Sequence, residues 1–331
     1  MDDACHEVQK LLLDRPKIAP ERAIDVLADI LAATRMSTLI HGRLELSAPW
    51  GIQFPEADAA HLYVVARGGA RLELAGASPA ILAAGDVALL PHGVRHCLRD
   101  AAHSPLRSLD PGECRRHQAL EPIRLGGGGA PTTLVAVAFA FRRFLLLARL
   151  PRVIQIAAND PAASPWLPAT AQLLVAESTS GRPGSTVVIN RLADVLFVHA
   201  LRTAIDGNPG CGEGLRALAD PPVARALALM HDRPEETWTV ETLASAVGLS
   251  RSGFAARFRA TVGEPPLEYL GGWRMTKAAQ LLRESDDSTS EVAERVGYQS
   301  DAAFNRAFKR WEGKGPGAYR RAHSRVAAGR A

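Results

Sequence analysis

The chain has 331 residues, of which 47% are hydrophobic and 22% charged, so it is long and apolar enough for two domains with separate cores. It contains no apolar run that would span a membrane, and its N-terminus, MDDACHEVQK, is polar and acidic. We therefore expect a cytoplasmic protein with no secretory signal and no membrane partner. The cysteines are widely spaced, which argues against a disulfide framework and against a four-thiolate zinc site.

Positive charge is concentrated at one end of the chain. Residues 1–220 contain 22 basic and 22 acidic side chains, whereas residues 221–331 contain 17 and 13, so the whole excess of +4 lies in the C-terminal third. This asymmetry favours a polyanionic partner for that part. A solvated, charged helix surface would give the same balance, so charge alone does not decide.

Periodicity divides the chain into three kinds of segment. Residues 21–34 have apolar side chains at helical spacing. From about Ser37 to Phe144, short apolar or alternating runs broken by Gly and Pro predict a β-barrel or sandwich, with turns such as Gly68-Gly69 suited to hairpins. After Pro165 the pattern is helical to the end of the chain.

Two helices are expected in the middle of the chain, at 167–179 and 187–205. The second is apolar on more than one face, so it must bury much of its surface. Packing within the monomer and packing in a homodimer are equally good explanations. The segment 206–214, DGNPGCGEG, then predicts a domain boundary.

An internal repeat is the strongest signal in the sequence. The segments starting at Val247 and Val296 share a Val-Gly pair, two phenylalanines, a proline and a tyrosine in the same order, at an offset of 49 and then 50 residues. Each copy predicts a helix-turn-helix motif: a short helix, a glycine turn, and a helix capped by Ser250 in the first copy and by Ser300 or Asp301 in the second. A helix at 269–285 would join them rigidly.

The second helix of each copy is predicted to lie in a DNA major groove. Its phenylalanines would hold it to the core, leaving a polar and basic face exposed. The predicted DNA-contacting residues are Arg251, Ser252, Ala255, Arg257 and Arg259 in the first copy, and Asp301, Ala302, Asn305, Arg306, Lys309 and Arg310 in the second.

The C-terminal region resembles the DNA-binding domain of the AraC/XylS family of bacterial transcription regulators. The resemblance rests on WRM at 273–275, on AAQLL after it, and on AERVGYQSDAAFNRAFKRWEG from residue 293 onwards. It covers about residues 221–322 and implies double-stranded promoter DNA as the partner. The family usually has an arginine where this chain has Ala256, which weakens the case for base contacts by the first recognition helix.

The N-terminal two-thirds resemble the cupin-like sensor domain of one branch of that family. GDVALLPHGVRH matches the second cupin motif through Gly85, Pro91, Gly93 and His96, with Pro91 and Gly93 forming a tight turn between strands. The resemblance implies an α+β fold in three parts: a cupin-like β-barrel with an N-terminal helix (1–160), a helical linker and dimerisation region (161–214), and an all-α domain with two helix-turn-helix motifs (215–331).

Several residues of the barrel are candidates for sensing. The first cupin motif offers only His61, so a metal site of three histidines and a glutamate is not encoded; His61 and His96 remain as candidate metal ligands, too few for a typical site. Strand alternation should place His96 and Cys97 on opposite sides. The candidate effector or sensor residues are His61, His92, His96, Cys97 and Cys114, the two cysteines having basic neighbours that favour a thiolate.

Two classes of function follow. The first is a sequence-specific DNA-binding regulator that responds to a small effector or an oxidant and contacts RNA polymerase if it is an activator. The second is a cupin-type metal-dependent enzyme with an appended nucleic-acid-binding module. The eroded metal motif and the duplicated helix-turn-helix favour the regulator, with no catalytic residues and no cofactor.

Overall fold

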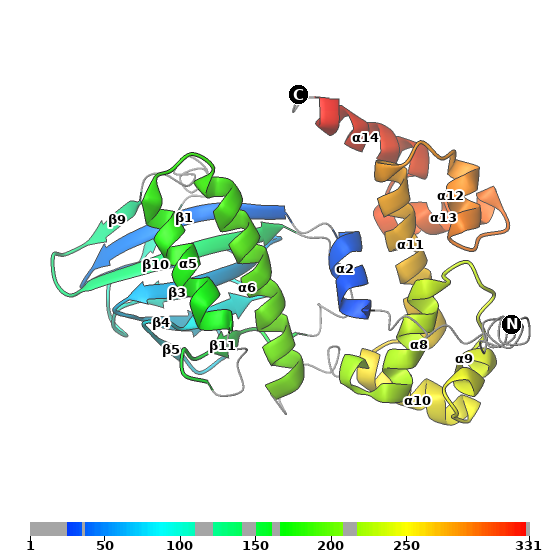
Figure 1. Ribbon diagram of the computed structural model, residues 1–331, viewed down its shortest axis with the longest axis horizontal. Coiled ribbons are helices and arrows are strands. Elements are labelled where there is room, and N and C mark those ends of the chain that lie inside the picture. Colours follow the sequence, from blue (N-terminus) through cyan, green and yellow to red (C-terminus); the bar gives the residue numbers. More distant parts are fainter. Residues whose placement is uncertain are drawn as a thin grey trace, which may run out of the picture.

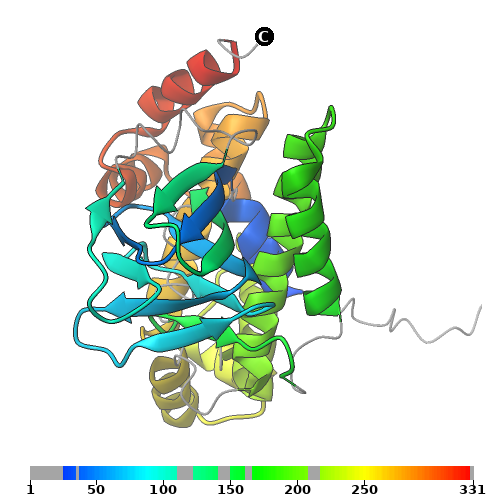
Figure 2. The same ribbon diagram turned by 90° about the vertical axis from the view of Figure 1, so that its left-hand side faces the viewer.

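The computed structural model describes residues 25–34, 37–109, 122–140, 150–160, 166–207 and 217–328. A β-rich region with two long helices is followed by a purely helical region (Figure 1), which confirms the predicted α+β class. Figure 2 views the molecule with the β-rich region in front of the helical one. Of the predicted domain linker at 206–214, the first two residues belong to the end of α6 (Ser185–Gly207), and the rest lies outside the described residues together with Cys5 and Cys114.

The β-rich region consists of two sheets. The larger has the strand order β11-β6-β3-β10-β1-β9 and the smaller has the order β5-β4-β7-β2-β8. Strands of the larger sheet are, in that order, Ile154–Ile156, Val87–Leu90, Ala60–Arg67, Pro131–Ala140, Ser37–Ser47 and Ile123–Gly126. Those of the smaller sheet are Ala80–Ala83, Gly69–Leu74, His96–Arg99, Gly51–Phe54 and Arg107–Ser108.

A closed apolar core fills the space between the two sheets. Trp50, Ile52 and Leu72 belong to it, and all three are almost completely buried. Alternate residues of strands such as β4 and β7 point into this core, as the period of two along a strand requires. The two sheets are therefore held together by side chains, with few backbone hydrogen bonds needed between them.

The turns at Gly68-Gly69 and at Gly93 connect the two sheets rather than closing hairpins. The prediction of a hairpin at Gly68-Gly69 was wrong: β3 pairs with β10 and β6, whereas β4 pairs with β5 and β7. The turn at Pro91 and Gly93 is confirmed, and it likewise leads from β6 in one sheet to β7 in the other. Gly93 has φ of +58°, and a Cβ there would lie 1.9 Å from the Ala57 carbonyl oxygen, so this corner admits no side chain.

Helices α5 (Trp166–Ser180) and α6 (Ser185–Gly207) cover the outer face of the larger sheet (Figure 1). Their buried residues join those of β3, β6 and β10 in one core, in which the rings of Phe139 and Phe197 lie 4.9 Å apart. This packing accounts for the apolar faces of the second middle helix within the monomer. A further apolar stripe on α5 and α6 stays exposed.

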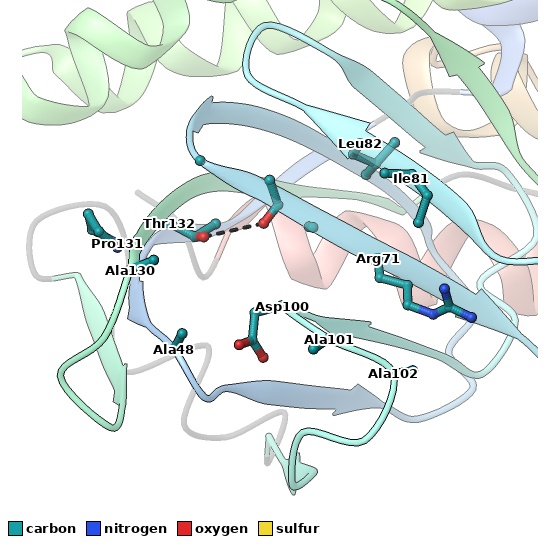
Figure 3. A pocket seen from close by; sticks show the side chains of 13 residues that line it. Ala48, Arg71, Ile81, Leu82, Asp100, Ala101, Ala102, Ala130, Pro131 and Thr132 are labelled. Atoms are coloured by element: carbon teal, nitrogen blue, oxygen red, sulfur yellow. Dashed lines mark hydrogen bonds between the residues drawn. The ribbon is translucent and has the colours of Figure 1, made fainter.

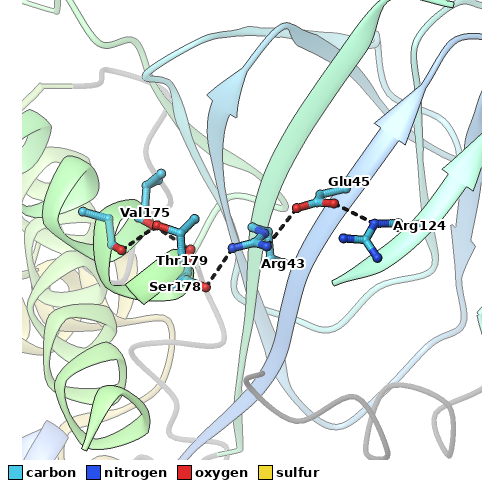
Figure 4. A network of polar contacts seen from close by, with 7 residues as sticks. Arg43, Glu45, Arg124, Val175, Ser178 and Thr179 are labelled. Carbon is cyan, nitrogen blue, oxygen red and sulfur yellow. Dashed lines mark hydrogen bonds and ion pairs between the residues drawn. The ribbon is translucent and has the colours of Figure 1, made fainter. Parts of the chain in front are cut away.

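A polar network fixes the end of α5 to the sheet (Figure 4). The Arg43 guanidinium donates to the Ser178 carbonyl oxygen at 3.0 Å and pairs with Glu45 at 2.8 Å. Glu45 in turn pairs with Arg124 of β9 at 2.9 Å. The chain of contacts therefore runs from the helix across β1 to the edge strand.

Helix α2 (Val26–Thr34) lies between the two regions of the molecule (Figure 1). Val26, Ile30 and Ala33 are buried in the core of the helical region, whereas Leu27 is buried in the core that α6 shares with the larger sheet. The N-terminal helix expected to belong to the barrel thus packs against both regions.

The helical region contains two small cores. Its helices are α8 (Pro221–Asp232), α9 (Val240–Ala246), α10 (Arg251–Val262), α11 (Pro266–Glu284), α12 (Thr289–Arg295), α13 (Asp301–Glu312) and α14 (Pro316–Ala328). Tyr269 and Trp273 of α11 belong to one core, and Ala278 and Leu282 of the same helix belong to the other. A single continuous helix therefore joins the two halves, as the sequence predicts.

Candidate nucleic-acid interface and sensor site

Each half of the helical region is a helix-turn-helix motif with its own caps. In the first, Thr239 and Thr242 form a capping box at the start of α9, and the Ser250 hydroxyl caps α10 by accepting from the Gly253 amide. In the second, Ser288 and Glu291 form the capping box of α12.

Ser300 is the cap of α13, which decides between the two predicted candidates. Its hydroxyl accepts from the Ala303 amide, whereas Asp301 is the first helical residue. An acidic side chain in that first turn is favourable beside the positive end of the helix dipole.

The recognition helices are held down by the predicted pairs of phenylalanines. Phe254 and Phe258 of α10 are fully buried with their rings 5.6 Å apart, and Phe304 and Phe308 of α13 are fully buried with their rings 5.7 Å apart. Because residues i and i+4 lie on one face of a helix, both helices turn the opposite face to solvent.

The spacing between the two motifs is fixed by Arg274 as well as by α11. Its guanidinium donates to the carbonyl oxygens of Pro234, at 2.6 Å, and Glu236, at 2.8 Å. The turn of the second motif packs on the same place, since a Cβ at Gly297 would lie 2.7 Å from Arg274 and 2.8 Å from Glu235. Burial lowers the pKa of the Arg274 guanidinium, and two backbone acceptors compensate for its loss of water.

The predicted DNA-contacting side chains lie on the solvent side of the two recognition helices. All are exposed except Ala255, which is half-buried; the exposed ones are Arg251, Ser252, Arg257 and Arg259 on α10, and Asp301, Ala302, Asn305, Arg306, Lys309 and Arg310 on α13. The structure therefore brings each set together on one helix.

Some of these side chains contact other protein groups. Arg251 pairs with Glu241 of α9, and Asp301, at the equivalent place in the second motif, accepts from the Ser290 hydroxyl at 2.5 Å. Each contact joins the first helix of a motif to the start of the recognition helix of the same motif. The sequence analysis missed Glu241 and Ser290, although the repeat offset of 49 residues puts them at equivalent positions in the two motifs.

Arg257 points away from the recognition face, toward α8. Its Nε donates to both carboxylate oxygens of Asp220, at 2.8 and 3.1 Å, and Asp220 also caps α8 by accepting from the Val223 amide. By contrast, among the described residues no carboxylate forms an ion pair with Arg306, Lys309 or Arg310.

In the β-rich region, His61 and His96 come together in a packed aromatic cluster. Their ring centroids lie 5.2 Å apart, and they are 4% and 1% exposed. Phe54 stacks on His96 at 4.8 Å, and Tyr63 also lies beside it at 5.6 Å. This end of the sandwich is filled by rings.

The hydrogen bonds of His96 define its protonation. Its Nδ1 lies 2.7 Å from the Val94 carbonyl oxygen, which only accepts, so Nδ1 carries a proton. Its Nε2 lies 2.7 Å from the Tyr63 hydroxyl and therefore accepts from it when the ring is neutral. A metal ion at Nε2 would have to displace that hydroxyl, so the donor set fits a metal poorly; no group of three or more potential ligands exists among the residues described.

The remaining sensor candidates lie apart from this cluster. His92 bonds to the Leu150 carbonyl oxygen at 2.7 Å. Cys97 is a half-buried free thiol on the outer side of β7, opposite to His96, as strand alternation predicts. Arg99, a basic neighbour of Cys97 in the sequence, is paired with Glu73 at 3.3 Å. Cys114 falls outside the described residues.

An open hollow of about 460 Å³ lies at the other end of the sandwich (Figure 3). Small residues such as Gly68, Gly69 and Ala101 form its walls, and Asp100 and Arg71 lie at its edge. A hydrogen bond from the Trp50 amide at 3.0 Å holds the Asp100 carboxylate in place. No pattern in the sequence predicted this hollow.

Two family profiles match the chain. The one described as a cupin covers residues 25–206, and the one described as a helix-turn-helix domain covers residues 243–322. A putative AraC-like transcription regulator from Streptomyces lividans is 36% identical over 90% of this chain and 98% of its own length. The chain belongs to the family of AraC-like transcription regulators.

Other relatives have similar names. The regulator AlkR from Acinetobacter baylyi is 29% identical over 90% of this chain and 99% of its own length. The DNA-binding domain of AdpA, solved in complex with a target DNA, is 40% identical and covers 31% of this chain and 93% of that chain, with a TM-score of 0.30. The sequence relatives and the helix-turn-helix profile confirm the prediction of a transcription regulator and support it over the alternative of a cupin-type enzyme. No described helix is long and apolar enough to cross a bilayer.

Proposed function

We propose that this AraC-like regulator binds promoter DNA by placing α10 and α13 in neighbouring major grooves. The observation that carries the proposal is the duplicated motif around one continuous helix, with Arg306, Lys309 and Arg310 exposed on α13. Recognition helices that reach successive grooves on one side of B-DNA lie about 34 Å apart. The continuous helix α11 supports the proposal because it holds the two motifs at one fixed separation.

The test is to select binding sites from random DNA with the full chain and then compare variants on the selected site. Arg306→Ala should weaken binding about 5- to 150-fold, the cost of a good base contact of about 1–3 kcal/mol. Arg67→Ala, which removes one charge from the exposed end of β3, is the matched control and should bind normally. Equal affinities of the two variants would contradict the assignment of α13.

The β-rich region is proposed to sense a small effector or an oxidant in the cytoplasm and to change how the motifs engage DNA. Two observations support this role: His61 and His96 lie in contact inside the sandwich, and Cys97 is a free, half-buried thiol. Cys97→Ser should leave DNA affinity intact and alter the response to inducers. If induction by every oxidant is unchanged, Cys97 is not the sensor.

A homodimer through α5 and α6 is part of the proposal. An exposed apolar stripe on these helices supports it; the exposed residues are Trp166, Leu173, Val187, Val188 and Val195. Sedimentation of the full chain should give a dimer, and Leu173→Glu combined with Val195→Glu should give a monomer.

A reporter gene would show whether the bound protein recruits RNA polymerase as an activator.

A further inference from the structure

The two recognition helices present different chemistry at equivalent positions. At the repeat offset of 50 residues, Ala255, Ala256 and Ala260 of α10 stand where α13 has Asn305, Arg306 and Arg310. Ala256 and Ala260 are exposed, as are their counterparts. The face that carries hydrogen-bond donors in the second motif therefore carries methyl groups in the first.

The arginines of α10 do not make up for this difference. Arg251 is paired with Glu241 and Arg257 with Asp220, so both are bound to carboxylates of the same domain. Of the cations of this helix, Arg259, the counterpart of Lys309, points to solvent on the recognition side. It lies one turn beyond Ala255, where it would meet the DNA backbone beside the groove.

A surface depression also lies beside the first turn of α10. An open depression of about 400 Å³ is lined by Val240 of α9 and by Arg251, Ser252 and Ala255 of α10. Arg251 is paired with Glu241, and Ser252 and Ala255 have short side chains, so the helix backbone can approach the floor of the groove closely. The group in that floor that suits an apolar surface is the C5-methyl of thymine, which is contacted by alanine methyl groups in protein–DNA complexes.

We propose that α10 selects its half-site by apolar contact with thymine methyl groups, whereas α13 selects its half-site by hydrogen bonds to base edges. The inference rests on the proposed function, because it needs both helices in major grooves. It predicts an operator with two chemically different halves: A·T pairs under α10 and at least one guanine or adenine read by donors of α13.

The test uses the full chain and the DNA site obtained by selection, with footprints of wild type and Arg306→Ala assigning each half-site to its helix. Replacing each thymine of the α10 half-site by deoxyuridine removes only a methyl group. We expect affinity to fall about fourfold for each contacted thymine, the equivalent of one buried methylene group. The same replacement in the α13 half-site should have less effect, whereas 7-deazaguanine there should weaken binding more.

A gain-of-function variant tests the proposal from the protein side. Ala256→Arg places at α10 the side chain that α13 has at the same position, on an exposed site where arginine is a good helix former. Repeated selection should then favour a guanine in the α10 half-site. The control variant Arg67→Ala should select the original site.

The outcomes separate the two proposals. If no specific site is selected, or if Arg306→Ala binds normally, the proposed function fails and the inference with it. If binding is specific and depends on Arg306, but deoxyuridine has no effect under α10 and Ala256→Arg raises affinity for all sequences alike, only the inference is overturned.

Discussion

The first and second helix-turn-helix motifs differ most on the exposed faces of α10 and α13 and least in what anchors these helices. Both use two buried phenylalanines, a serine cap and a glycine turn. Their surfaces differ at three equivalent positions, where α10 has alanines and α13 has Asn305, Arg306 and Arg310. A repeat can thus keep its interior, which determines folding, while its surface changes with the ligand.

The two motifs also differ in the hydrogen-bond partners of their equivalent tyrosines, Tyr269 and Tyr319. Tyr269 of the first bonds to the buried His231 at 2.7 Å, and Tyr319 of the second bonds to Arg283 at 2.5 Å. His231 also stacks on Trp273 at 3.7 Å, and its Nδ1 lies 3.6 Å from the Asp29 carboxylate of α2. The first motif therefore contacts the N-terminal helix through a titratable group, whereas the second rests on a permanent charge.

The largest expected effect tests whether the apolar cores of the two motifs contribute equally to stability. Phe258→Ala and Phe308→Ala should each lower the free energy of unfolding by about 3–5 kcal/mol, because both rings are fully buried. Urea denaturation followed by circular dichroism measures it. A difference of more than about 2 kcal/mol between the variants would show that the two cores are not equivalent.

The two turn glycines should separate the motifs. Gly248 and Gly297 have φ of +72° and +82°, so alanine is strained at both, by about 1–2 kcal/mol. A Cβ at Gly248 meets open space, whereas at Gly297 it would lie 2.8 Å from the Glu235 backbone. Gly297→Ala should therefore destabilise the domain more in the same denaturation experiment. Equal losses would mean that the close packing at Gly297 is relaxed in solution.

The roles of the α10 arginines can be separated by salt dependence. Arg259→Ala should lower the slope of log affinity against log salt by about one, as expected for a lost phosphate contact. Arg257→Ala should leave the slope unchanged and cost less than about 1 kcal/mol of stability, because its partner is Asp220 in a half-exposed ion pair. If Arg257→Ala changes the slope instead, Arg257 leaves Asp220 to bind DNA.

The last expected effect is a pH dependence of stability that arises from His231 of the first motif. Burial lowers the pKa of His231, with the Asp29 carboxylate acting in the opposite direction. The unfolded chain then binds the proton more readily, so stability is complete above about pH 6.5 and falls as the pH is lowered from there, by at most about 1.4 kcal/mol per pH unit. Denaturation between pH 7 and 5 measures it.

The control for this experiment is Arg283, the hydrogen-bond partner of Tyr319. His231→Gln should remove that part of the slope, while Arg283→Gln should lower stability equally at every pH because arginine stays charged throughout. Burial also lowers the pKa of His199 in the β-rich region, and this contribution should remain in both variants. An unchanged slope in His231→Gln would place the acid sensitivity elsewhere.

Local patterns in the sequence were sufficient for the helical region. The repeat, the caps and the phenylalanine pairs depend on residues close together in the chain, and the predicted helix joining the motifs is confirmed as α11. The sequence could not show that Arg251 and Arg257 are paired with Glu241 and Asp220, because a charge on a helix face does not reveal its partner. The sequence did indicate that an arginine is missing at Ala256, and the structure adds that this position is exposed.

The β-rich region was predictable in its strands but not in their connections. Alternation placed His96 inside and Cys97 outside, since a strand has a period of two. Pairing depends on which strands meet through space, so the expected hairpin at Gly68 was wrong.

By itself, the sequence determined the class of fold, the duplicated motif and the family of transcription regulators, because periodicity and spacing are local properties of a chain. Only the tertiary structure decided that α2 is shared between two cores, that rings fill the His61 and His96 end of the sandwich, and which arginines are already paired. These features arise from contacts between residues distant in sequence, where burial and the available partners, rather than residue type, determine what a side chain can do.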